Sequence, residues 1–422
     1  MDDLQSYVLT LGKNARQAAA QLATLTDATK VIALHSMAKA LRANAKALIE
    51  ANAKDLANAN DAGLVPSLVK RLALDEKKID GMAKGVEEIA AQVDPVGQVL
   101  EGYNRPNGLQ IIKQRVPLGV VLFFYESRPN VTSDAAALCI KSGNAIILRG
   151  GKEAFHSNRA IAHIIADALK DAHIDPAAVQ LVESTDRALV PLILKLDKYI
   201  DLVIPRGGEN LIRAVVKDST IPVLKHYTGN CHIYIDRSAA EMEKTVREVC
   251  VNSKTSYPGG AVCNAVEHLL FHKDIAAALL PMVCADLAAK GVEVRGDDRS
   301  RQLYPDGKAT TPEDWDTEYL AFVVSTKVVD SIDDAIAHIN EHGSHHTDGI
   351  LAADVNTTRK FVQQVDSASV MVNASTRFAD GGEYGLGAEI GISTDKLHAR
   401  GPMGALDLTT YKWVVTGDGH VR

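Results

Sequence analysis

The sequence has few cysteines, and no two of them form a Cys-x-x-Cys pair. Five cysteines in 422 residues, an odd number, argue against a disulfide framework and a zinc site, and they are typical of a reducing compartment. Apolar runs are also short, since none approaches the roughly 20 residues that a membrane span needs. The first residues, Met1-Asp2-Asp3, are acidic and lack the apolar stretch of a signal peptide. We therefore expect a cytoplasmic protein that does not enter a membrane.

Basic runs are absent as well, which argues against a nucleic-acid binder. The 46 lysines and arginines are outnumbered by 53 aspartates and glutamates, which gives a net charge of −7, and no basic segment dominates. Hydrophobic residues make up 46% of the chain and charged residues 23%, as in ordinary globular proteins. A chain of this length exceeds one ordinary core, so two or three domains are expected.

The usual nucleotide-binding fingerprints are missing, but two other glycine loops have the features of phosphate cradles. The sequence has neither Gly-x-Gly-x-x-Gly nor a P-loop. Residues 148–153 (Leu-Arg-Gly-Gly-Lys-Glu) and 204–209 (Ile-Pro-Arg-Gly-Gly-Glu) each follow a strand pattern and open a helical one. Their glycines let a backbone approach a ligand closely, and each loop adds a cation to a helix N-terminus. One such loop would be a plain strand–helix turn, whereas two in one sheet predict a phosphate-bearing cofactor.

Apolar periodicity predicts a helical N-terminal part followed by two α/β regions. Residues 1–94 show three helical patterns, of which the second begins at a cap, Asp27, and stops by Gly63. From Gly119 short apolar strands, including residues 221–224, alternate with helices, and a second such region follows. This alternation predicts parallel sheets that are covered on both faces and bind ligands beyond the carboxyl ends of their strands.

A hairpin pattern interrupts this organisation. Residues 99–103 and 109–116 flank Arg-Pro-Asn-Gly, and Asn-Gly favours tight turns with positive φ. The last strand pattern, residues 410–416, is a candidate to pair with this hairpin. Protruding ribbons of this kind often mediate contacts between subunits, so we expect an oligomer; the alternative is an ordinary surface hairpin.

The loop between residues 252 and 268 holds the cysteine with the features of a nucleophile. This loop joins a helical to a β-rich pattern, and Pro-Gly-Gly at 258–260 is followed three residues later by Cys263. A cysteine on a shaped loop between regular elements is a candidate nucleophile. The other cysteines lie at helix or strand spacing with apolar residues, which predicts that they are buried. They are Cys139, Cys231, Cys250 and Cys284.

Polar side chains follow the apolar strand pattern at residues 120–124. Glu126, Arg128 and Asn130 come shortly after it, where parallel sheets bind ligands. Arg128 has the fork of donors that holds a carboxylate or a phosphate. We therefore take these three as candidate substrate-binding residues, with a surface ion pair between Arg128 and Glu126 as the alternative.

The 14 histidines do not indicate a metal. His342, His345 and His346 are close in the sequence, but no cysteine or glutamate accompanies them at a recognised ligand spacing. We expect no metal site.

Several blocks of the chain together resemble the aldehyde dehydrogenase superfamily, and within it the branch that acts on an acyl phosphate of glutamate. The resemblance covers nearly the whole chain, and its motifs are too specific for a chance match. The blocks are Val-Pro-Leu-Gly-Val at 116–120, Tyr-Glu-Ser-Arg-Pro-Asn-Val at 125–131, Gly-Asn-Ala at 143–145 with residues 148–153, Asp-Ala-Ile at 334–336 with residues 342–348, and residues 385–394 and 398–404.

The resemblance implies an α/β fold in three parts. A Rossmann-like NADP-binding domain would comprise residues 1–96 and 117–236. An α/β catalytic domain, residues 237–399, would carry the nucleophile Cys263. Residues 97–116 and 400–422 would form a small β element for oligomerisation.

The resemblance also implies a reaction. NADPH would reduce L-glutamyl 5-phosphate to L-glutamate 5-semialdehyde and phosphate through a thioester on Cys263, the second step of proline biosynthesis from glutamate. Glu318 is similar to the glutamate that holds the nicotinamide ribose in this superfamily. Arg149 falls near the superfamily's adenosine-ribose lysine and, with Lys152, would meet the 2′-phosphate of NADP. The second cradle adds the cofactor-binding candidates Arg206, Gly207 and Gly208. A homo-oligomer and an association with glutamate 5-kinase are the expected partners.

The chain departs from the hydrolytic members of the superfamily at two places. They carry Glu-Leu-Gly-Gly, whose glutamate activates the deacylating water, whereas this chain has His-Tyr-Thr-Gly-Asn at 226–230. A reductase of an acyl phosphate must protect its thioester from water, so this loss makes chemical sense. Glu126 lies near the place of the superfamily's oxyanion-binding asparagine. The backbone N–H of Cys263 and the side chain of Asn264 are therefore the candidate oxyanion donors.

Two other functions stay open at this point. A CoA-acylating aldehyde dehydrogenase also needs no deacylating base, and CoA would then take the place of phosphate. A non-catalytic nucleotide-binding protein on the same fold is the alternative from another class, although the Cys263 loop and both cationic glycine loops argue against it.

Overall fold

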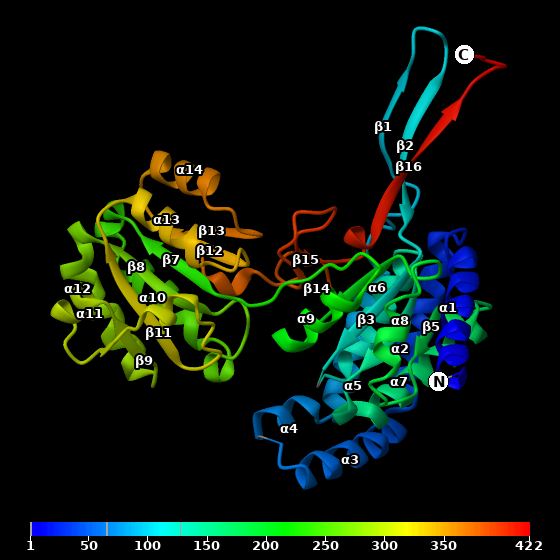
Figure 1. Cartoon of the computed structure of the whole chain (residues 1–422), viewed down its shortest axis with the longest axis horizontal. Coiled ribbons are helices and arrows are strands. Elements are labelled where there is room, and N and C mark those ends of the chain that lie inside the picture. The colour runs from blue at the N-terminus through cyan, green and yellow to red at the C-terminus, as the bar shows by residue number, and fades with distance from the viewer. Residues whose placement is uncertain (1, 65, 127) are drawn as a thin grey trace. The chain divides into compact units, whose positions relative to one another are not determined.

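The chain divides into two compact units, which Figure 1 shows in a computed structural model. The structure describes residues 2–64, 66–126 and 128–422, so Ser127 of the polar run after residue 124 lies outside the described residues. The first unit comprises Met1–Lys225, Gly385–Ile392 and Leu397–Arg422. The second unit comprises His226–Tyr384 and Ser393–Lys396.

A parallel sheet with the strand order β5-β4-β3-β6 forms the centre of the first unit. Its strands are β3 (Val120–Tyr125), β4 (Ala145–Gly150), β5 (Val179–Leu181) and β6 (Leu202–Pro205). Every residue of β3 is buried, because apolar side chains of the surrounding helices join the same core. A continuously apolar strand predicts this burial on both faces.

The described N-terminal residues form five helices before β1, where the sequence predicts three, and the short helix at Pro66–Leu72 is not among those predicted. The single helix predicted from Asp27 to Gly63 is wrong, because Asn44 separates two helices and its side chain donates to the carbonyl of Ala40. The cap of the first of these helices is Thr26 and not Asp27, since the Thr26 hydroxyl accepts the backbone N–H of Thr29. The helices of this unit are α1 (Asp2–Leu22), α2 (Asp27–Ala43), α3 (Ala45–Asp61), α4 (Pro66–Leu72), α5 (Glu76–Ala90), α6 (Asn130–Lys141), α7 (Phe155–Asp171), α8 (Leu189–Ile193) and α9 (Glu209–Asp218).

The strand predicted at residues 221–224 is also wrong. In the described chain this segment contributes only an isolated bridge between Val203 and Val223. The apolar run is there, and Ile221 and Leu224 are buried, but it is too short to continue the ladder.

The second unit is built on a seven-stranded sheet of described residues, in which all pairings are parallel and the order is β10-β9-β11-β8-β7-β12-β13. Its strands are β7 (Cys231–Ile235), β8 (Val266–His272), β9 (Glu293–Gly296), β10 (Lys308–Ala309), β11 (Val323–Val329), β12 (Thr347–Leu351) and β13 (Ser369–Val372). Its helices are α10 (Glu243–Thr255), α11 (Lys273–Ala289), α12 (Asp298–Leu303), α13 (Ile332–His342) and α14 (Val355–Gln364).

Alternating side chains of β7 show how both faces of this sheet are covered. Ile233 and Ile235 join the core formed with α10 and α11. Tyr234, between them, joins the core formed with α13 and α14, where its ring stacks on Phe361 at 6.3 Å between ring centroids. The helices therefore cover opposite faces of the sheet, as the predicted α/β pattern requires.

An antiparallel ribbon belongs to the first unit and extends away from its helices (Figure 1). The predicted hairpin is confirmed as β1 (Val99–Asn104) and β2 (Gln110–Pro117), and the C-terminal strand β16 (Thr409–Thr416) pairs with β2. Two short strands, β14 (Gly391–Ser393) and β15 (Gly401–Met403), pair with each other in a separate sheet. No helix of the described residues has the length and apolar character to span a membrane.

Candidate active site

Cys263 lies on a tight turn between two elements of the second unit. Helix α10 ends at Thr255, the turn at Pro258–Gly260 follows, and β8 begins at Val266. Gly260 has a φ of +66°, and a Cβ there would lie 3.0 Å from the carbonyl oxygen of Ala321. Cys263 is partly buried, whereas the four other cysteines are buried, as predicted. The turn therefore presents this thiol and keeps the others in the core.

The segment before β7 packs directly against the backbone of Cys263. A Cβ added to Gly229 would lie 1.8 Å from the Cys263 carbonyl oxygen, so only glycine permits this approach. The thiol of Cys231 lies 3.2 Å from the same oxygen and donates to it. Both contacts fix the carbonyl, and with it the turn that carries the Cys263 side chain.

The buried amide of Asn230 fixes this segment from its other side. Its Nδ2 donates to the carbonyls of Trp315 at 2.8 Å and His342 at 2.9 Å. Its Oδ1 accepts from His268 Nε2 at 2.6 Å. Three hydrogen bonds to a buried amide make residues 226–230 a rigid support.

Two imidazoles flank the thiol of Cys263. One donor atom each of His226, Cys263 and His346 lies within 4.8 Å of the other two. The rings of His226 and His346 meet edge to face, with centroids 5.4 Å apart. Among the described residues, no carboxylate oxygen joins this group. The described residues thus place two nitrogen bases beside the thiol and no carboxylate in the same group.

The sequence reasoning missed both histidines as neighbours of the thiol. His226 was noted only as the start of the stretch that replaces Glu-Leu-Gly-Gly, and His346 only within a rejected metal cluster. The sequence contains a signal for His226 alone, because the stretch that replaces Glu-Leu-Gly-Gly is expected at the active site. The sheet order that brings His346 to the same place is not visible in the sequence.

A buried ion pair lies beside this site in the second unit. Lys254 Nζ and Glu267 Oε2 are 2.6 Å apart, and both side chains are fully buried. Burial raises the pKa of Glu267 to about 8, against the lowering effect of Lys254, and the Glu318 carboxylate raises it further. Burial lowers the pKa of Lys254. Glu318, the ribose-binding candidate, is therefore close enough to this pair to interact with both of its charges.

The Asn264 side chain donates its amide to the backbone of the same unit. Its Nδ2 lies 3.0 Å from the carbonyl of Ala379 and 3.4 Å from that of Arg377, while its Oδ1 is buried with no hydrogen-bond partner. To donate to an oxyanion, the Asn264 amide would have to give up one of these two hydrogen bonds to carbonyls. The role stays a prediction.

The candidate residues divide between the two units. Cys263, Asn264 and Glu318 lie in the second unit. The candidates in the first unit are Glu126, Arg128, Asn130, Arg149, Lys152, Arg206, Gly207 and Gly208. Within that unit they lie at or just beyond the carboxyl ends of β3, β4 and β6, three neighbouring strands, where ligands are expected.

Carboxylates occupy part of the predicted phosphate cradles. Glu126 Oε2 accepts the backbone N–H of Gly208 at 3.1 Å, at the N-terminus of α9, where a negative charge is stabilised. Arg206 forms an ion pair with Glu389 at 3.3 Å. A Cβ on Gly151 would lie 2.2 Å from a carboxylate oxygen of Glu153. Each cradle attracts anions, and a bound phosphate would replace these carboxylates.

Arg149 and Asn130 are held by local contacts. Arg149 donates to the carbonyls of Gly150 at 3.0 Å and Asp186 at 3.4 Å, and burial lowers its pKa. Asn130 donates to Asp134 at 3.0 Å. Burial raises the pKa of Asp134 to about 6, although Arg206 acts in the opposite direction. Asn130, Asp134 and Arg206 thus form one polar cluster in the first unit.

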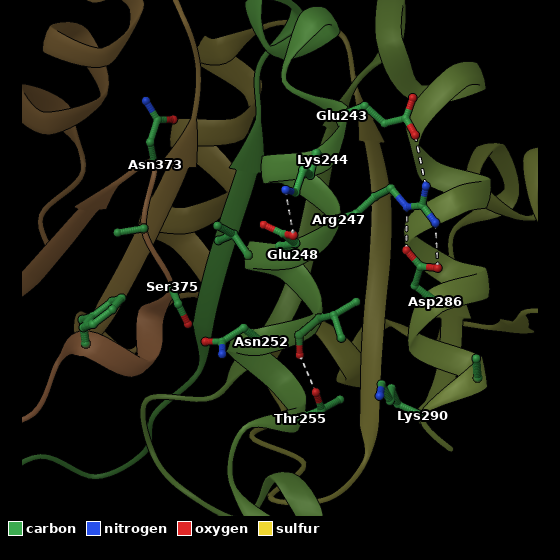
Figure 2. A pocket seen from close by; sticks show the side chains of 15 residues that line it. Glu243, Lys244, Arg247, Glu248, Asn252, Thr255, Asp286, Lys290, Asn373 and Ser375 are labelled. Carbon is green, nitrogen blue, oxygen red and sulfur yellow. Dashed lines mark hydrogen bonds and ion pairs between the residues drawn. The ribbon is translucent and has the colours of Figure 1, made fainter.

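A cavity of about 970 Å³ lies elsewhere in the second unit, between α10, α11 and residues 373–378 (Figure 2). Arg247 spans it and forms hydrogen bonds with both carboxylate oxygens of Asp286, at 2.7 and 3.0 Å, and with Glu243 at 3.0 Å. The Arg247 guanidinium is therefore paired with carboxylates of the same cavity wall. Cys263 does not line this cavity, and we place the chemistry at the thiol.

Comparisons with known proteins agree with this geometry. The sequence model of the "Aldehyde dehydrogenase family" matches residues 6–302. A curated protein of Caldanaerobacter subterraneus subsp. tengcongensis, named gamma-glutamyl phosphate reductase, is 51% identical over 411 residues, which cover 97% of this chain and 98% of that one. A crystal structure of gamma-glutamyl phosphate reductase from Thermotoga maritima is 46% identical and has a TM-score of 0.95; the match covers 98% of this chain and 99% of that one. An acetylating aldehyde dehydrogenase from Geobacillus thermoglucosidasius, 18% identical with a TM-score of 0.71 over 100% of this chain and 98% of that one, shares the fold.

Proposed function

Because this chain belongs to the aldehyde dehydrogenase family, we propose that it catalyses the reaction of its gamma-glutamyl phosphate reductase relatives. L-Glutamyl 5-phosphate is reduced to L-glutamate 5-semialdehyde with release of phosphate, in the biosynthesis of proline. The observation that carries this proposal is a partly buried thiol flanked by two imidazoles, which no carboxylate joins among the described residues. Such a thiol can form a thioester, and the stretch 226–230 lacks the glutamate that activates the deacylating water in hydrolytic members of the family.

Cys263 acts as the nucleophile. Its thiolate attacks the acyl carbon, the bond from that carbon to the phosphate oxygen breaks, and phosphate leaves with the electron pair. The thiol proton passes to one of the flanking ring nitrogens of His226 or His346, which lie within 4.8 Å. After reduction the oxyanion of the hemithioacetal re-forms the carbonyl, the carbon–sulfur bond breaks with its electron pair on sulfur, and the thiolate and the aldehyde are released.

The backbone around Cys263 positions these steps. The contacts of Gly229 and Cys231 with the Cys263 carbonyl hold the turn still, so the thiol keeps one attack geometry. The backbone N–H of Cys263 and the Asn264 amide are the proposed donors to the developing oxyanion.

The residues fit a phosphate-bearing nicotinamide cofactor, and we propose NADP(H). The cofactor supplies the hydride that reduces the thioester carbonyl. Arg149 is the penultimate residue of β4 and Lys152 follows the strand, so both lie at the carboxyl edge of the first unit's sheet and would meet a 2′-phosphate. Arg206, Gly207 and Gly208 would meet the diphosphate, and Glu318 would bind the nicotinamide ribose.

Substrate contacts and partners complete the proposal. Glu126, Arg128 and Asn130 would bind the glutamyl group. The ribbon formed by β1, β2 and β16 would join copies of the chain, because it exposes Tyr411 and Trp413 at 49% and 48% of their surface. A cytoplasmic location, a contact with glutamate 5-kinase and the three-part domain division stay predictions.

The test runs the reaction in reverse, with glutamate 5-semialdehyde and NADP as substrates. We expect NADPH to form with inorganic phosphate and not with CoA, which separates this function from that of a CoA-acylating enzyme. Cys263→Ser should remove the activity and leave NADP binding nearly intact. Cys284→Ser, a buried thiol on α11, is the matched control and should stay active. CoA-dependent turnover, or normal turnover by Cys263→Ser, would overturn the proposal.

A further inference from the structure

We propose that Cys263, His226 and His346 form an inhibitory site for a thiophilic divalent cation of the zinc class, which caps the thiol reversibly. The inhibition rests on the proposed function, because it requires Cys263 to be the nucleophile. The binding itself does not. The sequence predicts no metal site, on the grounds that His342, His345 and His346 lack a suitable partner. Of these three histidines, only His346 lies beside Cys263 and His226 in the structure.

The donor set is one that zinc prefers. Two imidazole nitrogens and one thiolate, with a fourth position open to water, correspond to the three-ligand sites that bind Zn²⁺ in proteins. The donor atoms lie within 4.8 Å of one another. With bonds of about 2.0 to 2.3 Å, a tetrahedral zinc site holds its donors roughly 3.3 to 3.6 Å apart. Contraction by at most about 1.2 to 1.5 Å, through side-chain rotations, would close the site.

The three donors are gathered by the order of the sheet. Strands β8, β7 and β12 are consecutive neighbours in the second unit, and all of them run parallel. Cys263 comes three residues before β8 begins, His226 five residues before β7, and His346 directly before β12. Each donor therefore lies at the amino-terminal edge of the same part of the sheet, on a segment that the sheet itself anchors.

The surroundings also orient the donors. His346 is buried, and its Nδ1 lies 2.9 Å from the hydroxyl of Thr347. When Nδ1 donates this hydrogen bond, Nε2 is the ring nitrogen that keeps the lone pair a metal requires, as second-layer hydrogen bonds ensure at zinc sites. Asn230 and Gly229 fix the segment that carries His226. Among the described residues, no other three His, Cys, Asp or Glu donors come equally close together.

The chemical consequence is direct. Binding of the cation releases the thiol proton, and the sulfur lone pair that would attack the acyl carbon forms the bond to the metal. The same bond shields the sulfur from alkylating reagents. Removal of the metal by a chelator restores the thiol unchanged, so no oxidant or reductant takes part.

Binding is tested with Co²⁺, because a cobalt–thiolate bond gives an absorption band that reports the sulfur ligand. The full chain, first treated with a chelator, is titrated with Co²⁺ and then with Zn²⁺. We expect one Co²⁺ per chain, a thiolate band that Zn²⁺ displaces, and protection of Cys263 from iodoacetamide in the wild-type protein by mass spectrometry. A chelator should reverse all three effects.

The variants identify the ligands. Cys263→Ser should abolish the thiolate band, and His226→Ala and His346→Ala should each weaken Co²⁺ and Zn²⁺ binding by at least about tenfold. His345→Asn is the matched control, because His345 has a φ of +58° that asparagine tolerates and its Nδ1 interacts with the carbonyl of Asp366. It should bind both metals as the wild type does.

Each outcome decides one statement. If both histidine variants keep wild-type affinity, or Co²⁺ gives no thiolate band and Zn²⁺ gives no protection, the site is refuted. If Zn²⁺ binds with the expected ligands but does not inhibit phosphate-dependent turnover, the inhibition is refuted. If the band appears in a protein that shows no such turnover at all, the metal site stands and the proposed function fails.

Discussion

Replacement of Gly229 by alanine is the sharpest single perturbation of the site, because it adds one methyl group where the backbone of Cys263 lies closest. The new Cβ would lie 1.8 Å from the Cys263 carbonyl oxygen, 2.5 Å from its carbonyl carbon and 2.6 Å from its Cα. Ordinary contacts begin at 3.4 Å. All three atoms are backbone, so a side-chain rotation cannot relieve the clash.

The size of the effect follows from this geometry. The carbonyl and the new methyl group must separate by about 1.6 Å to reach ordinary contact, and a misplacement of about 1 Å at a reacting group can lower the rate about 100-fold. We therefore expect kcat/KM to fall by about 100-fold, which corresponds to about 2.7 kcal/mol. Overpacking of this kind should also lower the free energy of unfolding by about 1 to 3 kcal/mol.

The assay measures phosphate-dependent formation of NADPH, the rate of Cys263 alkylation and the thermal midpoint. Gly81→Ala is the matched control, because a Cβ at Gly81 meets no atom within 4 Å and this residue lies in α5. It should keep full activity and gain up to about 1 kcal/mol of stability. If Gly229→Ala kept activity within twofold of the wild type, the close approach would not position the thiol.

Other predictions concern the support of the site and the ribbon. Asn230→Ala removes the three hydrogen bonds of a buried amide, and we expect it to destabilise the second unit by about 2 to 4 kcal/mol in urea unfolding. Lys254→Met leaves Glu267, whose pKa is about 8, as a buried carboxyl without its hydrogen-bond partner, and should cost about 1 to 3 kcal/mol, measured in the same way. Burial lowers the pKa of His338 to about 2. Below about pH 6.5 the unfolded chain therefore binds a proton at His338 that the folded chain does not, and stability falls as pH falls. His338→Gln should remove about 1.4 kcal/mol per pH unit from that slope between about pH 6 and 4. Trp413→Lys should lower the mass measured by light scattering if the ribbon joins subunits.

The fold was predictable where hydrophobic patterning decides it. The continuously apolar run that became β3 indicated a covered parallel sheet, and the Asn-Gly turn indicated the hairpin. The α/β class is confirmed on these grounds. The pattern failed at Asn44, because one polar residue with good local hydrogen bonds ends a helix without a change in apolar period.

The candidate site was predictable only in part. A cysteine after Pro-Gly-Gly is visible in the sequence, because turn chemistry is local. The neighbours of Cys263 are not visible, since His226 is 37 positions before it and His346 is 83 positions after it. Their proximity depends on which strands are adjacent, and the order β8-β7-β12 crosses the chain order. Sequence spacing carries no such information.

The candidate residues lie at the carboxyl edge of the first unit's sheet and at the amino edge of the second unit's sheet. In the first unit the candidate substrate loop lies at the end of β3 and the candidate cofactor loops at the ends of β4 and β6, so all of them lie at the carboxyl edge that the general rule indicates. In the second unit the thiol and its imidazoles precede β8, β7 and β12, so they lie at the amino edge. Applied to the second sheet, the carboxyl-edge rule would predict a catalytic base after β7 or β12. The rule describes where a ligand phosphate meets helix N-termini, and it does not govern a thiol that needs a fixed turn and nitrogen bases. Gly229 and Asn230 meet that need, which is why we expect their substitution to impair catalysis.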